Sequence, residues 1–240
     1  RGRHWHFIAQ SLNELNQQLQ PYGTTIHVLE GEAETLLKTL HQHLPIKQLF
    51  SHAETGLGLT FDRDQRIMRF CTTEGIRWQE FQSNGVQRGR TDRRGWNRAW
   101  HQMMGQPLIS ANLNRLSTLH QPLPEALLGA QTRRLARWET QKPDFQRGGT
   151  QAASSVLTSF LDVRAQRYQM SISRPEAARH HCSRLSPHLA WGNLSLRQTY
   201  HALKHRQNDG EWGRALGAFE SRLHWHCHFI QKFEMECRME

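Results

Sequence analysis

Residues 182–198 hold the side chains of this sequence that are best suited to bind an anion. Ser183, Arg184 and Ser186 lie within the four residues before Pro187. A serine followed by a proline is typical of a helix start, with the serine as N-cap and the proline in the first turn. Free N–H groups at a helix N-terminus, together with the helix dipole, attract phosphate groups. The segment indicates either a phosphate or pyrophosphate site or an ordinary capped helix, and the residues by themselves leave both open.

Three histidines alternate along a short stretch near the C-terminal end. His224 and His228 share a helix face at a spacing that zinc sites use. His226 and Cys227 point elsewhere on such a helix, and the sequence has neither an H-E-x-x-H motif nor an evident third ligand. We therefore favour histidines that are buried or face DNA, and we predict no metal site.

The charge of the chain points to a polyanionic partner. Lys and Arg outnumber Asp and Glu by 31 to 21, which gives a formal net charge of +10. This balance favours DNA, RNA or a cofactor phosphate as a ligand, although a basic protein without such a ligand also fits it. Five arginines could line an anion site, but a solvated linker is the more common role of such a run: Arg88, Arg90, Arg93, Arg94 and Arg98.

Composition restricts the class of protein. The 240 residues suffice for one large domain or two small ones, and 8 tryptophans argue against a disordered chain. The cysteines are scattered without a C-x-x-C pair, which favours a reducing compartment, and we expect the cytoplasm. No run approaches the roughly 20 apolar residues that a membrane span needs. The cysteines are Cys71, Cys182, Cys227 and Cys237.

Hydrophobic patterning divides the chain into three parts. Residues 1–87 alternate between helical and strand patterns, which predicts a parallel sheet covered by helices, and no G-x-G-x-x-G follows any predicted strand. Residues 88–150 indicate an interdomain linker with short helices, and residues 151–240 are helical throughout. The predicted strands are 25–29, 46–51 and 76–81, and the predicted helices are 4–19, 32–43, 60–74, 133–139, 152–168, 186–191, 195–205 and 211–240.

The segment at 182–198 strongly resembles the S-x-L-S-P-x-L-x-x-G-x-L-S-x-R pattern of photolyases and cryptochromes. Gly148-Gly149, Tyr168 and Arg174-Pro175 fit the same family, as do the S-H-A-E-T-G sequence at 51–56 and Asp62-Arg63-Asp64. The resemblance covers nearly the whole chain. It implies an α/β Rossmann-like parallel-sheet antenna domain over 1–87 and an incomplete all-α FAD-binding domain over 151–240.

The resemblance also implies roles for single residues. Cys182 stands where many members have threonine, and residues 219–229 stand in place of a helix that commonly reads W-x-x-E-L-x-W-R-x-F. In that helix Phe219 replaces a tryptophan, Arg222 an acidic residue and His226 an arginine, while Trp225 is kept. The implied FAD-binding residues are Tyr168, Cys182, Ser183, Arg184, Leu185, Ser186 and Phe219, and the implied DNA-binding residues are Arg174, Arg222, Trp225 and His226.

The function implied by the resemblance is that of a flavoprotein with FAD and a second, antenna chromophore of folate or deazaflavin type. One reading is a monomeric photolyase, a carbon–carbon lyase that repairs DNA containing pyrimidine dimers under blue light. A second is a cryptochrome, which is a photoreceptor without repair activity. A third reading, which rests on the basic charge, is a helical DNA-binding module without flavin.

The two ends of the sequence indicate a fragment of such a protein. The first strand of the family is expected before Arg1, and further helices of the FAD domain are expected after Glu240, where the sequence stops without a helix cap. We therefore expect this chain to be inactive alone. The tryptophan chain that carries electrons in the family would also lie beyond Glu240, so we expect Trp191, Trp212 and Trp225 to serve packing.

Overall fold

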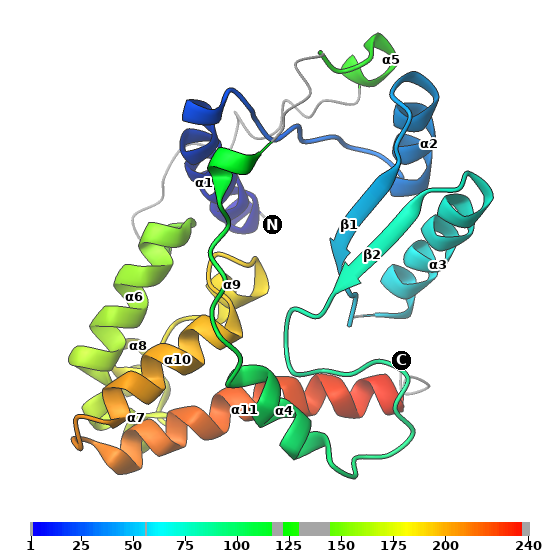
Figure 1. The fold of residues 1–240 in the computed structure, drawn as a ribbon. Helices are drawn as coiled ribbons and strands as arrows, with labels where there is room; N and C mark the ends of the chain where they lie inside the picture. The colour runs from blue at the N-terminus through cyan, green and yellow to red at the C-terminus, as the bar shows by residue number, and fades with distance from the viewer. Residues whose placement is uncertain (1, 56, 117–121, 130–144, 237–240) are drawn as a thin grey trace.

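A small parallel sheet and a larger group of helices make up the computed structural model, which describes residues 2–55, 57–116, 122–129 and 145–236 (Figure 1). Strands β1 (Gln48–His52) and β2 (Arg77–Phe81) pair in parallel, from Gln48 opposite Arg77 to His52 opposite Phe81. The sheet is accompanied by helices α2 (Ala33–His43) and α3 (Gly58–Thr73). The predicted α/β fold of the N-terminal part, followed by a helical part, is confirmed.

The sheet is covered by apolar side chains on one face only. Leu49 and Trp78 pack against Ile67 and Phe70 of α3, which form the core of this part. Phe50, on the opposite face, stacks on Phe81 at 6.2 Å between ring centroids, and both side chains are exposed. This alternation follows from the two-residue period of a strand, in which successive side chains point to opposite faces.

The predicted strand over residues 25–29 does not form. The segment has only an isolated bridge at Leu29. Its backbone is held instead by a side chain of the preceding helix, since Asn16 Oδ1 accepts a bond from the Ile26 N–H at 2.8 Å and one from the Thr25 hydroxyl at 3.0 Å. A strand needs a neighbouring strand for its polar groups, and here Asn16 supplies part of that hydrogen bonding.

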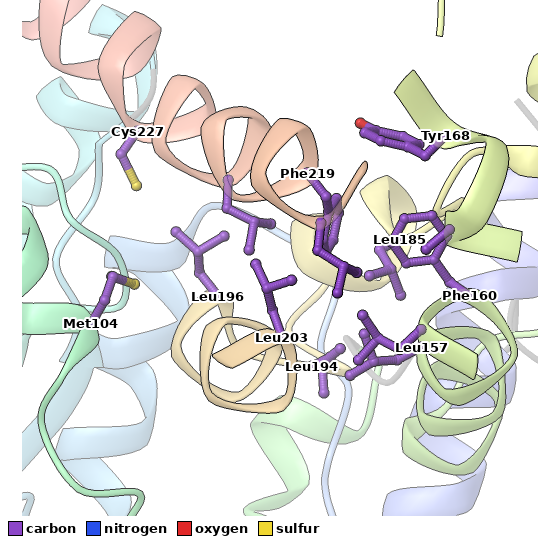
Figure 2. Packing of buried hydrophobic residues seen from close by; sticks show 14 of the residues in the cluster. Met104, Leu157, Phe160, Tyr168, Leu185, Leu194, Leu196, Leu203, Phe219 and Cys227 are labelled. Carbon is purple, nitrogen blue, oxygen red and sulfur yellow. The ribbon is translucent and has the colours of Figure 1, made fainter. Parts of the chain in front are cut away.

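The helical part is built around one apolar core, which Figure 2 shows in part. Trp96 and Trp100 of α4 are fully buried in it, together with Phe160, Leu203 and Leu216. Residues predicted as linker therefore supply two of its largest side chains, while the domain boundaries stay a prediction. The helices are α1 (Gly2–Leu19), α4 (Trp96–Met104), α5 (Glu125–Leu128), α6 (Thr150–Asp162), α7 (Tyr168–Ser171), α8 (Pro175–His181), α9 (Ser186–Ala190), α10 (Leu196–Gln207) and α11 (Gly213–Met235).

Two predicted helices are shorter than their patterns suggested. The helix expected over 152–168 stops at Asp162, because Val163 leaves the helical conformation with φ −133°. The helix expected from Glu211 begins at Gly213, because Trp212 takes a left-handed φ of 54°. The helix expected over 133–139 lies outside the described residues. Within the described part, no helix is long and apolar enough to cross a membrane.

Helix α1 is joined to the start of α6 by hydrogen bonds that only a close approach permits. The Glu14 carboxylate accepts from the N–H groups of Thr150 at 2.7 Å and Gln151 at 3.1 Å, and Gln10 Oε1 accepts from Gly148 N–H at 2.8 Å. The first N–H groups of a helix lack partners within it, so a carboxylate there is stabilising. The segment before α6 must lie against α1 for these bonds to form.

A second junction joins the chain after β2 to α11. The buried Gln231 side chain accepts from the Gln87 N–H at 2.7 Å and donates to the Gln87 carbonyl at 2.9 Å. Next to it, the Gly85 N–H lies 3.3 Å from Cys227 Sγ, and Trp96 Nε1 donates to the Gly85 carbonyl at 3.0 Å. A buried amide that satisfies both backbone groups of one residue fixes the sheet-to-helix connection.

We predict that Gly148→Ala destabilises the protein, because a Cβ at Gly148 would lie 2.0 Å from the Phe7 carbonyl oxygen of α1. Forcing these backbones apart should cost about 1–3 kcal/mol. Gly217→Ala in α11 is the matched control, since a Cβ there meets nothing within 4 Å. It should instead stabilise the helix by about 0.5–1 kcal/mol. Urea unfolding of both variants measures the difference, and equal stability would contradict the close approach of α1.

Candidate functional site

The loop 182–185 between α8 and α9 is held by an arginine that the sequence analysis missed. The Arg164 guanidinium donates to the carbonyls of Cys182, Ser183 at 3.3 Å and Val156 at 2.8 Å. Burial lowers the pKa of Arg164, and the neighbouring charge of Arg184 lowers it further. One cation therefore fixes the loop backbone from beneath, and the side chain of Arg184 adds a second positive charge nearby.

The predicted cap of α9 is different from the one observed. Ser186 was expected as the N-cap, but it is the first helical residue, and Leu185 occupies the cap position without a side-chain cap bond. Pro187 lies in the first turn, as expected. The cause is Arg184, whose left-handed φ of 63° turns the chain one residue earlier. With only 5 residues, α9 is too short for its dipole to carry an anion site by itself.

Three of the residues predicted to contact FAD lie in the protein core, as Figure 2 shows for Tyr168, Leu185 and Phe219. The Phe219 ring packs on Phe160 at 4.6 Å between centroids, and Tyr168 packs edge-on against both phenylalanines at 5.3 and 5.8 Å. These edge-to-face contacts are favourable for aromatic rings. Both rings are therefore held in place by contacts within the core, and little of either is exposed.

The Tyr168 hydroxyl has Cys182 and Arg222 as electrostatic neighbours. The pKa of Tyr168 is raised to about 12, mainly by burial and also by Cys182, while Arg222 opposes the shift. Burial likewise raises the pKa of the Cys182 thiol. The Tyr168 hydroxyl and the Cys182 thiol are therefore both protonated at neutral pH, and each could donate a hydrogen bond to an anion.

The exposed face of α11 combines aromatic and basic side chains. The Arg222 guanidinium carbon lies 4.3 Å from the Trp225 ring, and Trp225 meets Phe229 edge-on at 5.8 Å. Trp225 and Phe229 are 43% and 58% exposed, and His226 is exposed beside them. The expectation that Trp225 serves packing is therefore wrong. A cation over an exposed indole is suited to stacking against a nucleic-acid base.

The remaining tryptophans and Arg174 occupy separate places. Trp191 is 53% exposed, so the expectation that it packs in the core is wrong. Trp212 is half-buried against the core, with the Arg206 guanidinium carbon 4.6 Å from its ring. Arg174 is exposed at the cap position of α8, and its carbonyl accepts from the Ala178 N–H at 2.8 Å. In the described chain, no interaction links it to the exposed face of α11.

Two cavities border α9, and one of them also borders the loop. One of about 350 Å³ lies between the start of α1 and α9, and Arg184 and Ser186 line it. The other, of about 450 Å³, lies between the carboxyl ends of the strands and α9–α10, and is lined by His52, Asn84 and His226 among others. The predicted residues are therefore distributed over different surfaces, since Tyr168, Cys182, Leu185 and Phe219 line neither of these two cavities.

The histidines of α11 are engaged with neighbours from the α4 region. His224 Nε2 lies 3.1 Å from Asn97 Oδ1, and His228 contacts the Arg93 guanidinium. Both rings also pack on Trp96. Among the described residues, no three His, Cys, Asp or Glu side chains gather closely enough to hold a metal ion.

Known proteins resemble this chain in part by sequence and almost throughout by fold. The family model for DNA photolyase matches residues 1–90. No curated protein matches the chain. A class III photolyase from Agrobacterium tumefaciens is 19% identical with a TM-score of 0.67, over 97% of this chain and 50% of that one.

Two further solved structures show the same similarity. The archaeal photolyase from Sulfolobus tokodaii is 17% identical with a TM-score of 0.63, over 97% of this chain and 49% of its own. The cryptochrome from Synechocystis is 17% identical with a TM-score of 0.70, over 98% of this chain and 51% of its own. The chain thus spans about half the length of these structures. The resemblance recognised in the sequence is confirmed over residues 1–90, which match the DNA photolyase family model, and the chain has the fold shared by photolyases and cryptochromes.

Proposed function

We propose that the protein is an FAD-dependent, deoxyribodipyrimidine photolyase-like enzyme that repairs pyrimidine dimers in DNA under blue light. The observation that supports this proposal is the fold that the chain shares with solved photolyases and cryptochromes, together with the match of residues 1–90 to the DNA photolyase family model. When bound, FAD would supply the light-driven electron transfer, while the protein supplies position and electric field.

The side chains present fit a flavin phosphate. The Tyr168 hydroxyl stays protonated at neutral pH and can donate a hydrogen bond, and Arg184 supplies positive charge near Cys182. Arg164 holds the carbonyls of Cys182 and Ser183, which turns the loop amides toward other partners. The Cys182 thiol fits a phosphate less well, because a thiol donates a weaker hydrogen bond than the threonine hydroxyl that many family members have at this position. We therefore expect phosphate binding to depend mainly on the loop backbone, Tyr168 and Arg184.

DNA would meet the exposed face of α11 and the start of α8. Arg174, Arg222 and His226 could contact phosphates, and Trp225 could stack on a base that has left the duplex. The excess of basic residues over the whole chain would add long-range attraction.

A cryptochrome-type photoreceptor is the second candidate. The specific observation in its favour is that Arg222, which stands where the family pattern has an acidic residue, already stacks on Trp225. That contact would compete with a lesion base for the same indole. A pyrimidine-dimer repair assay under blue light separates the two functions.

We further propose that the cavity of about 450 Å³ binds the antenna chromophore, of folate or deazaflavin type. It opens outside the carboxyl ends of β1 and β2, where open α/β sheets commonly bind ligands. Trp191 on its wall offers an exposed ring for a planar pigment.

We also propose that the protein is a monomer and that it lies in the cytoplasm. The free thiols of Cys71, Cys182 and Cys227 support a reducing compartment.

The first test is the visible absorbance of the protein purified from its complete reading frame in the dark. We expect a flavin band that bleaches or shifts under blue light. Tyr168→Phe keeps the ring packing but removes the hydroxyl, so flavin affinity should fall roughly 2- to 10-fold, as expected for one hydrogen bond. Tyr200→Phe is the matched control and should retain full flavin content. A colourless wild-type protein that still binds DNA would leave the non-flavin DNA-binding module as the better account.

DNA binding gives a second test. Replacing Arg174 or Arg222 by Gln should lower the affinity for DNA and reduce the slope of log affinity against log salt by about 1 for each lost phosphate contact. Fluorescence anisotropy with a labelled oligonucleotide at several salt concentrations measures both quantities. Arg69→Gln removes the same charge from the exposed surface of α3 and should leave the slope unchanged. Equal effects of all three variants would show that only net charge matters.

A further inference from the structure

Three histidines gather where α4 and the loop before it meet α11 (Figure 1). His101 comes from α4, and His224 and His228 come from successive turns of α11. The His224 ring lies 6.2 Å from the ring of His101 and 6.3 Å from that of His228, measured between centroids. Neither the flavin site nor the DNA face proposed above uses these histidines, so the cluster calls for a separate explanation.

The contact of His228 with Arg93 requires a neutral imidazole. The Arg93 guanidinium reaches both ring nitrogens, with Nη1 3.4 Å from Nε2 and Nη2 in contact with Nδ1. A guanidinium has donors only, so a ring nitrogen of His228 must accept the hydrogen bond. An imidazolium has no lone pair to accept with. Protonation of His228 would therefore replace this hydrogen bond by two like charges in contact.

The second imidazole, His224, is enclosed by indole rings. Its centroid lies 4.9 Å from that of Trp96 and 4.9 Å from that of Trp100, and both tryptophans are fully buried. Its Nε2 donates to Asn97 Oδ1 at 3.1 Å, which leaves Nδ1 to take up a proton. Among the described residues Nδ1 has no hydrogen-bond partner. A proton there would bring a charge into this apolar contact without an acceptor.

The groups that lie closest to the two imidazoles carry positive charge or gain it on protonation. They are Arg93 from the loop before α4, His101 from α4 and Lys232 from α11. Helix α10 adds the neutral Tyr200, which packs edge-on against Trp100 at 5.5 Å. Attraction of an imidazolium to the indoles would offset only part of the repulsion between these cations.

The carboxylates of the surrounding elements already have other partners. Glu220 of α11 lies near His101 but is bound by Lys204 of α10 at 2.7 Å. Asp92, in the loop before α4, accepts from the Arg94 N–H at 2.8 Å. In the described part of the chain, no carboxylate forms an ion pair with either imidazole of α11. Protonated imidazoles would thus lack a counter-charge.

The pKa of each imidazole is lowered, first by burial and then by its neighbours. The charges of His101, His228 and Arg93 act on the pKa of His224, and those of Arg93 and Lys232 act on that of His228. As the pH falls, the unfolded chain therefore takes up these protons before the folded chain does. Stability from this contact is complete above about pH 6.5, the ordinary histidine value, and is lost as the pH falls below it.

We propose that His224 and His228 form a pH-sensitive latch between α11 and the chain that leads from β2 into α4. At neutral pH the latch is closed, because Arg93 and Asn97 bind the two neutral imidazoles. In mild acid both imidazoles are protonated, and the loop that carries Arg93 moves away from α11. The device needs neither flavin nor DNA.

Opening of the latch would loosen the junction between the sheet and the helical part. The same stretch of chain bonds to α11 through the Gly85 N–H, which lies 3.3 Å from Cys227 Sγ, and the Gln87 N–H, which donates to Gln231 Oε1 at 2.7 Å. Both amides are protected from solvent only while the loop lies against α11. Their hydrogen exchange therefore reports the state of the latch.

The test is hydrogen–deuterium exchange of these two amides at about pH 7.5 and about pH 5.5, on either side of the histidine transition and corrected for intrinsic exchange rates. In the wild type we expect protection to fall roughly tenfold or more at the lower pH. In the double variant His224→Gln/His228→Gln it should fall by less than about twofold, because glutamine does not titrate. His180→Gln, which removes an exposed histidine of α8, should behave as the wild type does.

Arg93→Gln gives a second measurement that keeps both histidines, should the double variant fail to fold. Titration of the rings by NMR should show a His228 pKa below about 6.5 in the wild type and a higher pKa in Arg93→Gln. The proposal is overturned if His228 titrates at the ordinary value in the wild type, or if wild-type protection is equal at both pH values. It is also overturned if the double variant loses as much protection as the wild type, or if the amides of α3 lose it equally.

Discussion

The capping of α6 by Glu14 is the contact on which the arrangement of the helical part depends. One carboxylate of α1 accepts the N–H groups of Thr150 and Gln151, while a second residue of α1 binds the Gly148 N–H. The bonds are possible because Gly148 and Gly149 have no side chains to keep α1 away. Since α1 also supplies Phe7 and Arg3, this contact sets the position of one whole wall of the cavity beside α9.

The direction of the chain after α6 depends in turn on Arg164. The helix stops at Asp162, and the Arg164 side chain then reaches back to the Val156 carbonyl and across to the carbonyls of the loop. The short turn that follows carries Tyr168 into the core against Phe160. A single half-buried cation therefore holds backbone carbonyls of both the helix and the loop, and its desolvation is offset by the carbonyls that it binds.

Most elements could be predicted from the sequence because they depend on local periodicity. The helices near Leu12 and Leu36 and the strand around Trp78 follow from apolar spacing, and the Ser195–Gln198 capping box begins α10 where the sequence indicated a helix. The failures have long-range causes. Residues 25–29 have a strand composition but bind Asn16, and the apolar pattern continues past Val163 although Arg164 ends the helix there. No local pattern reports a partner that is distant in the sequence.

The candidate site could be located from the sequence, but the direction of its side chains could not. The motif places five residues together at 182–186, and the fold then assigns them to two sides of one loop. Leu185 is anchored in the core, whereas its neighbours Arg184 and Ser186 line the cavity toward α1. The left-handed turn at Arg184 produces this division, since it reverses the chain within a single residue. Leu185 thus anchors the loop in the core, while the polar residues on either side of it line a cavity that a ligand could enter.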